Sequence, residues 1–195
     1  MKDRKFFGNK SSDEIIKTIQ EFHGWAAPGV IIGAIMVDYA LENLPAEAEK
    51  DAIVETTHCL PDSIQLFTPC TFGNGWMKVA DWDRFALTFY DKKTLNGFRV
   101  WLDPEKLKHF TVVNNWYMRL VPKKSIPLEV LNEAILSAGR DMLSGKKVTV
   151  TGLYGKKEKN NISICSGCGE PYSASTGALC QQCSGHGYFK YSSAE

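Results

Sequence analysis

Apolar and polar positions in the first quarter of the chain recur at intervals that predict two consecutive helices. Apolar residues at positions 15, 16, 19 and 22 have helical spacing. Ser11 and Glu14 precede them in the pattern of a capping box. An almost wholly apolar stretch then runs from Pro28 to about Asn43 and predicts a buried helix that begins at the proline. Its apolar run is too short to cross a bilayer.

Shorter alternating runs predict strands in the middle of the chain, at 53–54, 77–80, 84–90, 98–102 and 148–150. Asn96-Gly97 is typical of a hairpin turn between two of them. Further helices are expected after Pro45, at 104–110 and at 127–143, with Gly145 ending the last one. Mixed helices and antiparallel strands predict an α+β domain in which helices pack on an antiparallel sheet.

Composition narrows the class of protein only slightly. The 195 residues carry a formal charge of +1, with 23 Lys and Arg against 22 Asp and Glu, which disfavours nucleic acid as a partner. The N-terminus lacks the apolar segment of a signal peptide. The six cysteines are not arranged as a secreted disulfide framework. We therefore expect a cytoplasmic protein without a membrane segment.

Four cysteines near the C-terminus form the strongest motif of the chain: Cys165, Cys168, Cys180 and Cys183. Each C-x2-C pair offers two thiolates from one tight turn, and two such pairs complete the tetrahedral set that structural zinc requires. A polar segment at 156–161 precedes them. The sequence thus predicts an N-terminal domain at 1–158 and a small zinc ribbon at 159–195. The ribbon either serves structure alone or also docks a partner. A protein partner is favoured over DNA, because Lys190 is the only lysine or arginine from Ile162 to Glu195.

A weaker set of candidates lies in the N-terminal domain, where reactive side chains gather at the expected ends of elements. His23, Cys59 and Cys70 would offer one imidazole and two thiols to a soft or borderline metal if they converge. His58 and Asp62 would then orient these ligands or add to them. The alternative is that His23 is a polar helix cap and that the two cysteines are small buried hydrophobes.

Three segments and the terminal cysteines, in this order, resemble the FmdE family, which takes its name from a gene product of formylmethanofuran dehydrogenase operons. The segments are Phe22-His-Gly-Trp-Ala-Ala-Pro-Gly29, Cys59-x-x-Asp62-x-x-Gln65 and Cys70-Thr-x-Gly-Asn-Gly75. The resemblance implies an α+β domain with a metal-ligating or catalytic cluster, to which His23, Cys59 and Cys70 correspond. The family's first motif resembles F-H-G-H-x-C-P-G, so Trp25 and Ala27 stand where it has a histidine and a cysteine.

The resemblance implies a zinc-binding accessory protein that handles a metal or supports a molybdenum or tungsten formylmethanofuran dehydrogenase-type metalloenzyme. The candidate partners are a second copy of the chain, in a homodimer, and such a metalloenzyme. The candidate cofactors are the structural Zn²⁺ and a second metal in the N-terminal domain. One alternative is a cysteine-dependent or metal-dependent enzyme whose reaction uses His23, Cys59 and Cys70. Another is a regulatory ribbon that docks protein or nucleic acid. Two ligands of the first loop are missing, so we expect the N-terminal metal to bind weakly or not at all.

Overall fold

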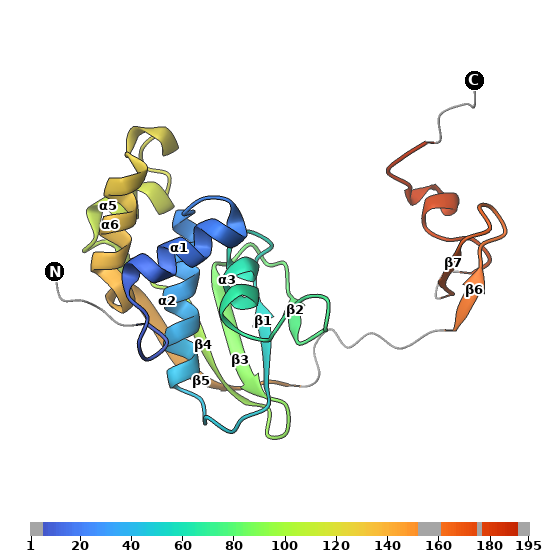
Figure 1. The fold of residues 1–195 in the computed structure, drawn as a ribbon, viewed down its shortest axis with the longest axis horizontal. Coiled ribbons are helices and arrows are strands. Elements are labelled where there is room, and N and C mark those ends of the chain that lie inside the picture. The colour runs from blue at the N-terminus through green and yellow to red at the C-terminus, as the bar shows by residue number, and fades with distance from the viewer. Residues whose placement is uncertain (1–5, 152–160, 175–176, 191–195) are drawn as a thin grey trace. The chain divides into compact units, whose positions relative to one another are not determined.

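A computed structural model describes residues 6–151, 161–174 and 177–190. The chain forms two units, Met1–Gly155 and Lys156–Glu195 (Figure 1). We call them the N-terminal domain and the ribbon. The predicted α+β class is confirmed, and the predicted polar segment at 156–161 lies almost wholly outside the described residues. None of the helices in the described part of the chain is long and apolar enough to span a membrane.

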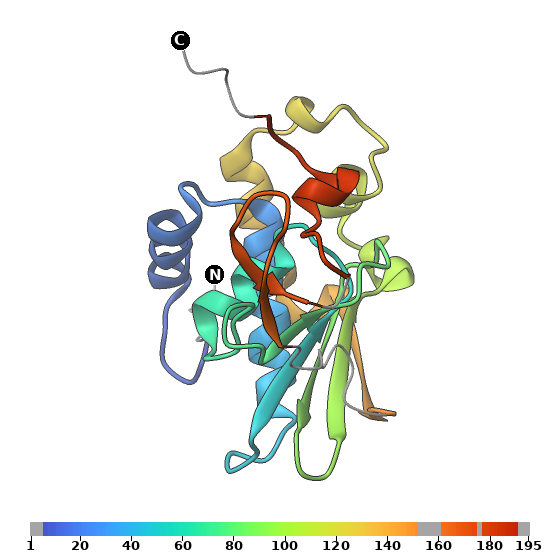
Figure 2. The ribbon, with the colours of Figure 1, turned by 90° about the vertical axis from the view of Figure 1, so that its right-hand side faces the viewer.

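The N-terminal domain is built on a five-stranded, mostly antiparallel sheet in the order β2-β1-β3-β4-β5 (Figure 2). Only β1 and β2 are parallel, and helix α3 connects them. The crossover is expected because parallel neighbours cannot be joined by a tight turn. The strand bounds are β1 Lys50–Val54, β2 Met77–Val79, β3 Ala86–Asp91, β4 Asn96–Leu102 and β5 Leu143–Thr149.

Helix α1 (Ser12–His23) begins at the predicted capping box, in which Ser11 accepts from the backbone N–H of Glu14 and donates its own N–H to the Glu14 carboxylate. Helix α2 (Pro28–Glu42) begins at the predicted proline and is buried along almost its whole length. The remaining helices are α3 Leu60–Phe67, α4 Pro104–Leu107, α5 Thr111–Tyr117 and α6 Leu128–Ala138, with 3-10 turns at Lys123–Ser125 and Gly139–Met142.

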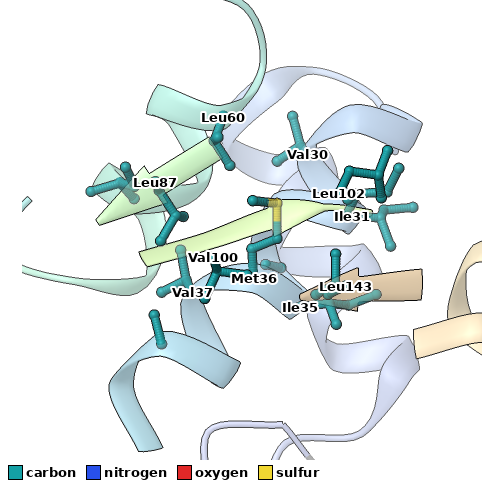
Figure 3. Packing of buried hydrophobic residues seen from close by; sticks show 14 of the residues in the cluster. Val30, Ile31, Ile35, Met36, Val37, Leu60, Leu87, Val100, Leu102 and Leu143 are labelled. Carbon is teal, nitrogen blue, oxygen red and sulfur yellow. The ribbon is translucent and has the colours of Figure 1, made fainter. Parts of the chain in front are cut away.

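The core of this domain lies between α2 and the sheet. Figure 3 shows Val30, Met36 and Val37 of α2 among Leu87 and Val100 of the strands. All five side chains are fully buried. Each large aliphatic group removed from water contributes about 1.5–3 kcal/mol, so the burial of α2 stabilises the domain.

Three details of the sequence prediction were wrong. No helix forms after Pro45, where only a short turn leads into β1, because so few residues cannot offset the cost of helix nucleation. The turn between β3 and β4 precedes Asn96-Gly97: the Asp91 carboxylate accepts from the N–H of Lys93 and the hydroxyl of Thr94. The helix predicted at 127–143 ends at Ala138, because the following segment pairs with β4 along the whole of β5.

The ribbon contains a two-stranded antiparallel sheet of β6 (Ile162–Ile164) and β7 (Pro171–Ser173), and a helical turn at Gln182–His186. Ile162 and Ile164 are more than 60% exposed. Cys165 is the one residue of the described ribbon among the buried apolar groups. A unit with so little apolar burial needs another source of stability.

Candidate metal centres

The four ribbon cysteines converge on one point. Their sulfur atoms all lie within 4.8 Å of one another, and Cys168 Sγ is 3.9 Å from Cys180 Sγ. Four Zn–S bonds of about 2.3 Å in a tetrahedron place the sulfurs about 3.8 Å apart. The donors therefore fit a zinc ion in number, type and spacing. Within the described residues, this is the one group of three or more metal-ligating side chains that comes together.

Backbone amides prepare this site for thiolates. The N–H of Cys180 donates to Cys165 Sγ at 3.3 Å, and the N–H of Gly167 donates at 3.4 Å. Backbone hydrogen bonds, the largest from Cys180 and then those from Cys168 and Gly167, lower the pKa of the Cys165 thiol to about 6. A Cβ on Gly167 would lie 2.9 Å from Cys183 Sγ, so the loop needs a glycine to approach the sulfurs closely.

In the N-terminal domain, the structure joins His23 to Asp62. His23 is the last residue of α1, and Asp62 lies in the first turn of α3. His23 Nδ1 is 2.6 Å from Asp62 Oδ2, and both side chains are largely but not fully buried. A carboxylate on one ring nitrogen fixes the ring's orientation and leaves Nε2 as the ligating or basic atom. Metal-binding histidines commonly have this arrangement.

Cys59 stands directly before α3 in a strained backbone conformation. Its φ of 53° and ψ of −48° form a γ-turn, in which the N–H of Leu60 donates to the carbonyl of His58 at 2.5 Å. Such strain persists only where surrounding structure enforces it. The side chain packs against the first turn of α2: a Cβ on Gly29 would lie 2.9 Å from Cys59 Sγ. The thiol therefore sits beside the N-terminal ends of two helices.

The two substituted positions of the first motif lie in the loop between α1 and α2. Trp25 is half exposed, and its ring centre is 6.1 Å from that of His23. Ala27 is buried, and its carbonyl accepts the N–H groups of Val30 and Ile31. Trp25 thus flanks His23, while Ala27 offers no donor side chain at the start of α2.

Cys59 and Cys70 lie beyond opposite ends of α3. Cys59 precedes α3 and Cys70 follows it, and the eight residues of that helix advance about 12 Å. Cys70 is fully buried, and its thiol donates to the carbonyl of Lys50 at 3.4 Å. Burial raises the pKa of the Cys70 thiol. Within the described residues, the ligating atoms of His23, Cys59 and Cys70 do not all lie within 4.8 Å of one another. His58 is exposed beside Cys59.

Sequence reasoning missed two charged clusters on and just after β1. The buried Glu55 carboxylate accepts from Arg99 Nε at 2.7 Å and Arg84 Nε at 2.8 Å. Asp51, also buried, pairs with Lys78 and, at 3.1 Å, with Lys92. The available signal was the spacing of the two acids, because positions 51 and 55 share one face of an extended chain.

Comparisons with known proteins give the following matches. The family described as "FmdE, Molybdenum formylmethanofuran dehydrogenase operon" matches residues 22–151, and "FmdE treble clef zinc finger" matches residues 156–190. The crystal structure of a tungsten formylmethanofuran dehydrogenase FmdE-like protein from Syntrophus aciditrophicus is 43% identical, with a TM-score of 0.88 over 97% of this chain and 100% of that one.

A curated relative from Archaeoglobus fulgidus, called a probable S-adenosyl-L-methionine-binding protein, is 34% identical over 99 residues, or 47% of this chain. The chain spans 27% of that relative's length.

Proposed function

The chain belongs to the FmdE family, and from this premise we propose that it is an accessory protein that handles a metal ion for a molybdenum or tungsten formylmethanofuran dehydrogenase-type enzyme. The four-cysteine cluster and the zinc-finger match support a resident structural zinc. The handled ion would bind elsewhere, at His23 and Cys59. The observation that carries this proposal is the 2.6 Å contact between His23, in the family's first motif, and Asp62, in its second.

Weak binding suits such a role. His23 Nε2 and Cys59 Sγ are borderline and soft donors that favour zinc and related transition metals. Two donors leave the rest of the coordination shell to water or to a partner's side chains. An ion held in this way exchanges readily, whereas four thiolates retain theirs. The chain would therefore keep one metal and pass on another.

A cobalt titration of the full-length, zinc-loaded protein tests the proposal. Co²⁺ takes zinc-type ligands, and its visible absorption reports thiolate coordination. We expect saturable binding that His23→Ala and Cys59→Ser each abolish or weaken by at least tenfold. His109→Ala and Cys70→Ser are matched controls: His109 is exposed just beyond α4, and Cys70 lies beyond α3. Binding that persists in both His23→Ala and Cys59→Ser would refute the proposal.

A second candidate function is a thiol-dependent enzyme with Cys59 as the nucleophile. The strained γ-turn at Cys59 favours it, because nucleophiles are often displayed on sharp strand-to-helix turns. Iodoacetamide modification of Cys59 across pH, followed by mass spectrometry, tests it. A reactive nucleophile should be alkylated well below pH 8.5, the ordinary thiol pKa. Modification that begins only at about pH 8.5 would exclude this function.

A further inference from the structure

The N-terminal domain contains a cavity of about 590 Å³ at the end of the sheet where β1 begins and α3 ends. Its volume lies within the range typical of small-molecule sites. Most of its wall is apolar, and Phe89 and Cys70 in that wall are fully buried, so the cavity reaches the core. The lining residues that matter here are Leu41, Phe67, Cys70, Trp76, Phe89 and Lys92.

The charged residues of the wall are Lys50, Lys92 and Glu49, so the wall carries more positive than negative charge. The Lys92 ammonium lies 3.1 Å from Asp51 Oδ1 and 4.1 Å from the centre of the Trp76 ring. Asp51 also pairs with Lys78, so one carboxylate is shared between two ammonium groups. An ammonium has three N–H donors, and the ion pair with Asp51 engages at most one of them. Lys92 therefore retains donors and an unbalanced charge at the cavity.

Cys70 contributes shape and not reactivity. Its thiol is bonded to the carbonyl of Lys50, and burial raises its pKa. A protonated thiol is a weak nucleophile, so the cavity suits reversible binding. The cavity also lies at the opposite end of α3 from Cys59, about 12 Å along the helix, and is separate from the candidate metal centre.

From this geometry we propose that the cavity binds a small organic monocarboxylate with an apolar or aromatic body. The body would lie against Phe67, Phe89 and Trp76, and the carboxylate would accept from Lys92. A single unbalanced positive charge matches a monoanion better than a dianion such as phosphate. This binding function goes beyond metal handling and does not depend on it.

A fluorine NMR titration of the full-length protein tests the proposal, with 4-fluorobenzoate as probe and neutral 4-fluorobenzamide as its isostere. We expect a dissociation constant of about 1 mM or below for the acid and weaker binding of the amide. Lys92→Met removes the charge while keeping an apolar stem. It should weaken binding of the acid at least tenfold without affecting binding of the amide. Lys108→Met is the matched control, because Lys108 is exposed and pairs with Glu105, and neither residue lines the cavity.

Ala48→Trp provides an independent variant that should fill the cavity and abolish binding of both probes. It decides the matter if Lys92→Met fails to fold, which circular dichroism would show. Selective loss of acid binding in Lys92→Met, or loss of binding of both probes in Ala48→Trp, supports the proposal. The proposal would be overturned if 10 mM acid gave no saturation, if Lys92→Met and Lys108→Met had equal effects, or if binding were unchanged in Ala48→Trp.

Discussion

The N-terminal domain and the ribbon are stabilised by different means. The domain buries a continuous apolar cluster centred on α2, whereas the described ribbon residues contribute only Cys165 to the buried apolar groups. Cysteine sulfurs meet at the centre of the ribbon, where the domain has aliphatic side chains. The difference shows that one chain combines a fold held by the hydrophobic effect with one held by metal–thiolate bonds. Perturbations should therefore separate the two units.

The largest effect is expected from Cys168→Ser. Structural zinc contributes about 10–16 kcal/mol in small zinc-finger peptides, so losing one ligand should unfold residues ~162–190. The N-terminal domain should stay folded because its core contains no ribbon residue. Two-dimensional amide NMR and zinc analysis provide the measurements. Ser163→Ala, in the same unit but without a ligand atom, should keep both zinc and structure. A ribbon that stays folded without zinc would contradict the metal-based account.

A core substitution should produce the reverse pattern. Ile35 is fully buried in α2, and Ile35→Ala should cost the domain about 2–5 kcal/mol. Zinc in the ribbon should be retained. Val130→Ala is the control, because Val130 is about half exposed on α6 and its truncation should change stability by about 0.5 kcal/mol or less. Denaturant unfolding with zinc release followed in parallel would test this. Loss of zinc in Ile35→Ala at native conditions would show that the units are not independent.

A smaller effect is expected from Gly29→Ala, which connects the domain's packing with its candidate metal centre. The added Cβ would lie 2.9 Å from both Cβ and Sγ of Cys59, so the two helices must shift. We expect a loss of about 1–3 kcal/mol from overpacking, together with weaker Co²⁺ binding. Gly73→Ala should be silent, because no atom lies within 4 Å of its added Cβ. Thermal unfolding and the cobalt titration measure both effects, and unchanged cobalt binding would separate Cys59 from the site.

The smallest effect concerns the decline in the free energy of unfolding of the N-terminal domain at acidic pH. Burial would raise the pKa of Glu55, but Arg99 and then Arg84 outweigh it and hold the pKa below its usual range. Because the folded pKa is the lower one, Glu55 stabilises the fold above about pH 4.3, its unfolded value, and that contribution is lost as pH falls further. Glu55→Gln should flatten the decline in domain stability below about pH 4.3, while Glu47→Gln should not. An unchanged slope in Glu55→Gln would refute this assignment.

Local signals made part of the fold and the ribbon predictable. The capping box at Ser11, the proline at the start of α2 and its unbroken apolar run each act within a few residues, and the structure has all three. The cysteine spacing is equally local, and the sulfurs meet. The end of α6 was missed because pairing of β5 with β4 outweighed helix propensity.

The candidate N-terminal site was less predictable because its contacts link distant segments. His23 and Asp62 are 39 residues apart, and only tertiary packing joins them. The family motifs suggested that Cys70 would lie beside His23 and Cys59. The order of motifs along a chain does not give the distance between them in the fold, and α3 lies between Cys59 and Cys70 in the chain. The γ-turn at Cys59 and the cavity beyond α3 leave no local pattern in the sequence.

Metal content per chain tests the central claim most directly, measured on full-length protein purified without added metal and again on the double variant Trp25→His, Ala27→Cys. We predict about one zinc per chain, held by the ribbon, because the loop beside His23 lacks two donors. Restoring a histidine and a cysteine there should raise the content towards two. A content near two in the unaltered protein, or one that stays near one in the double variant, would contradict this account.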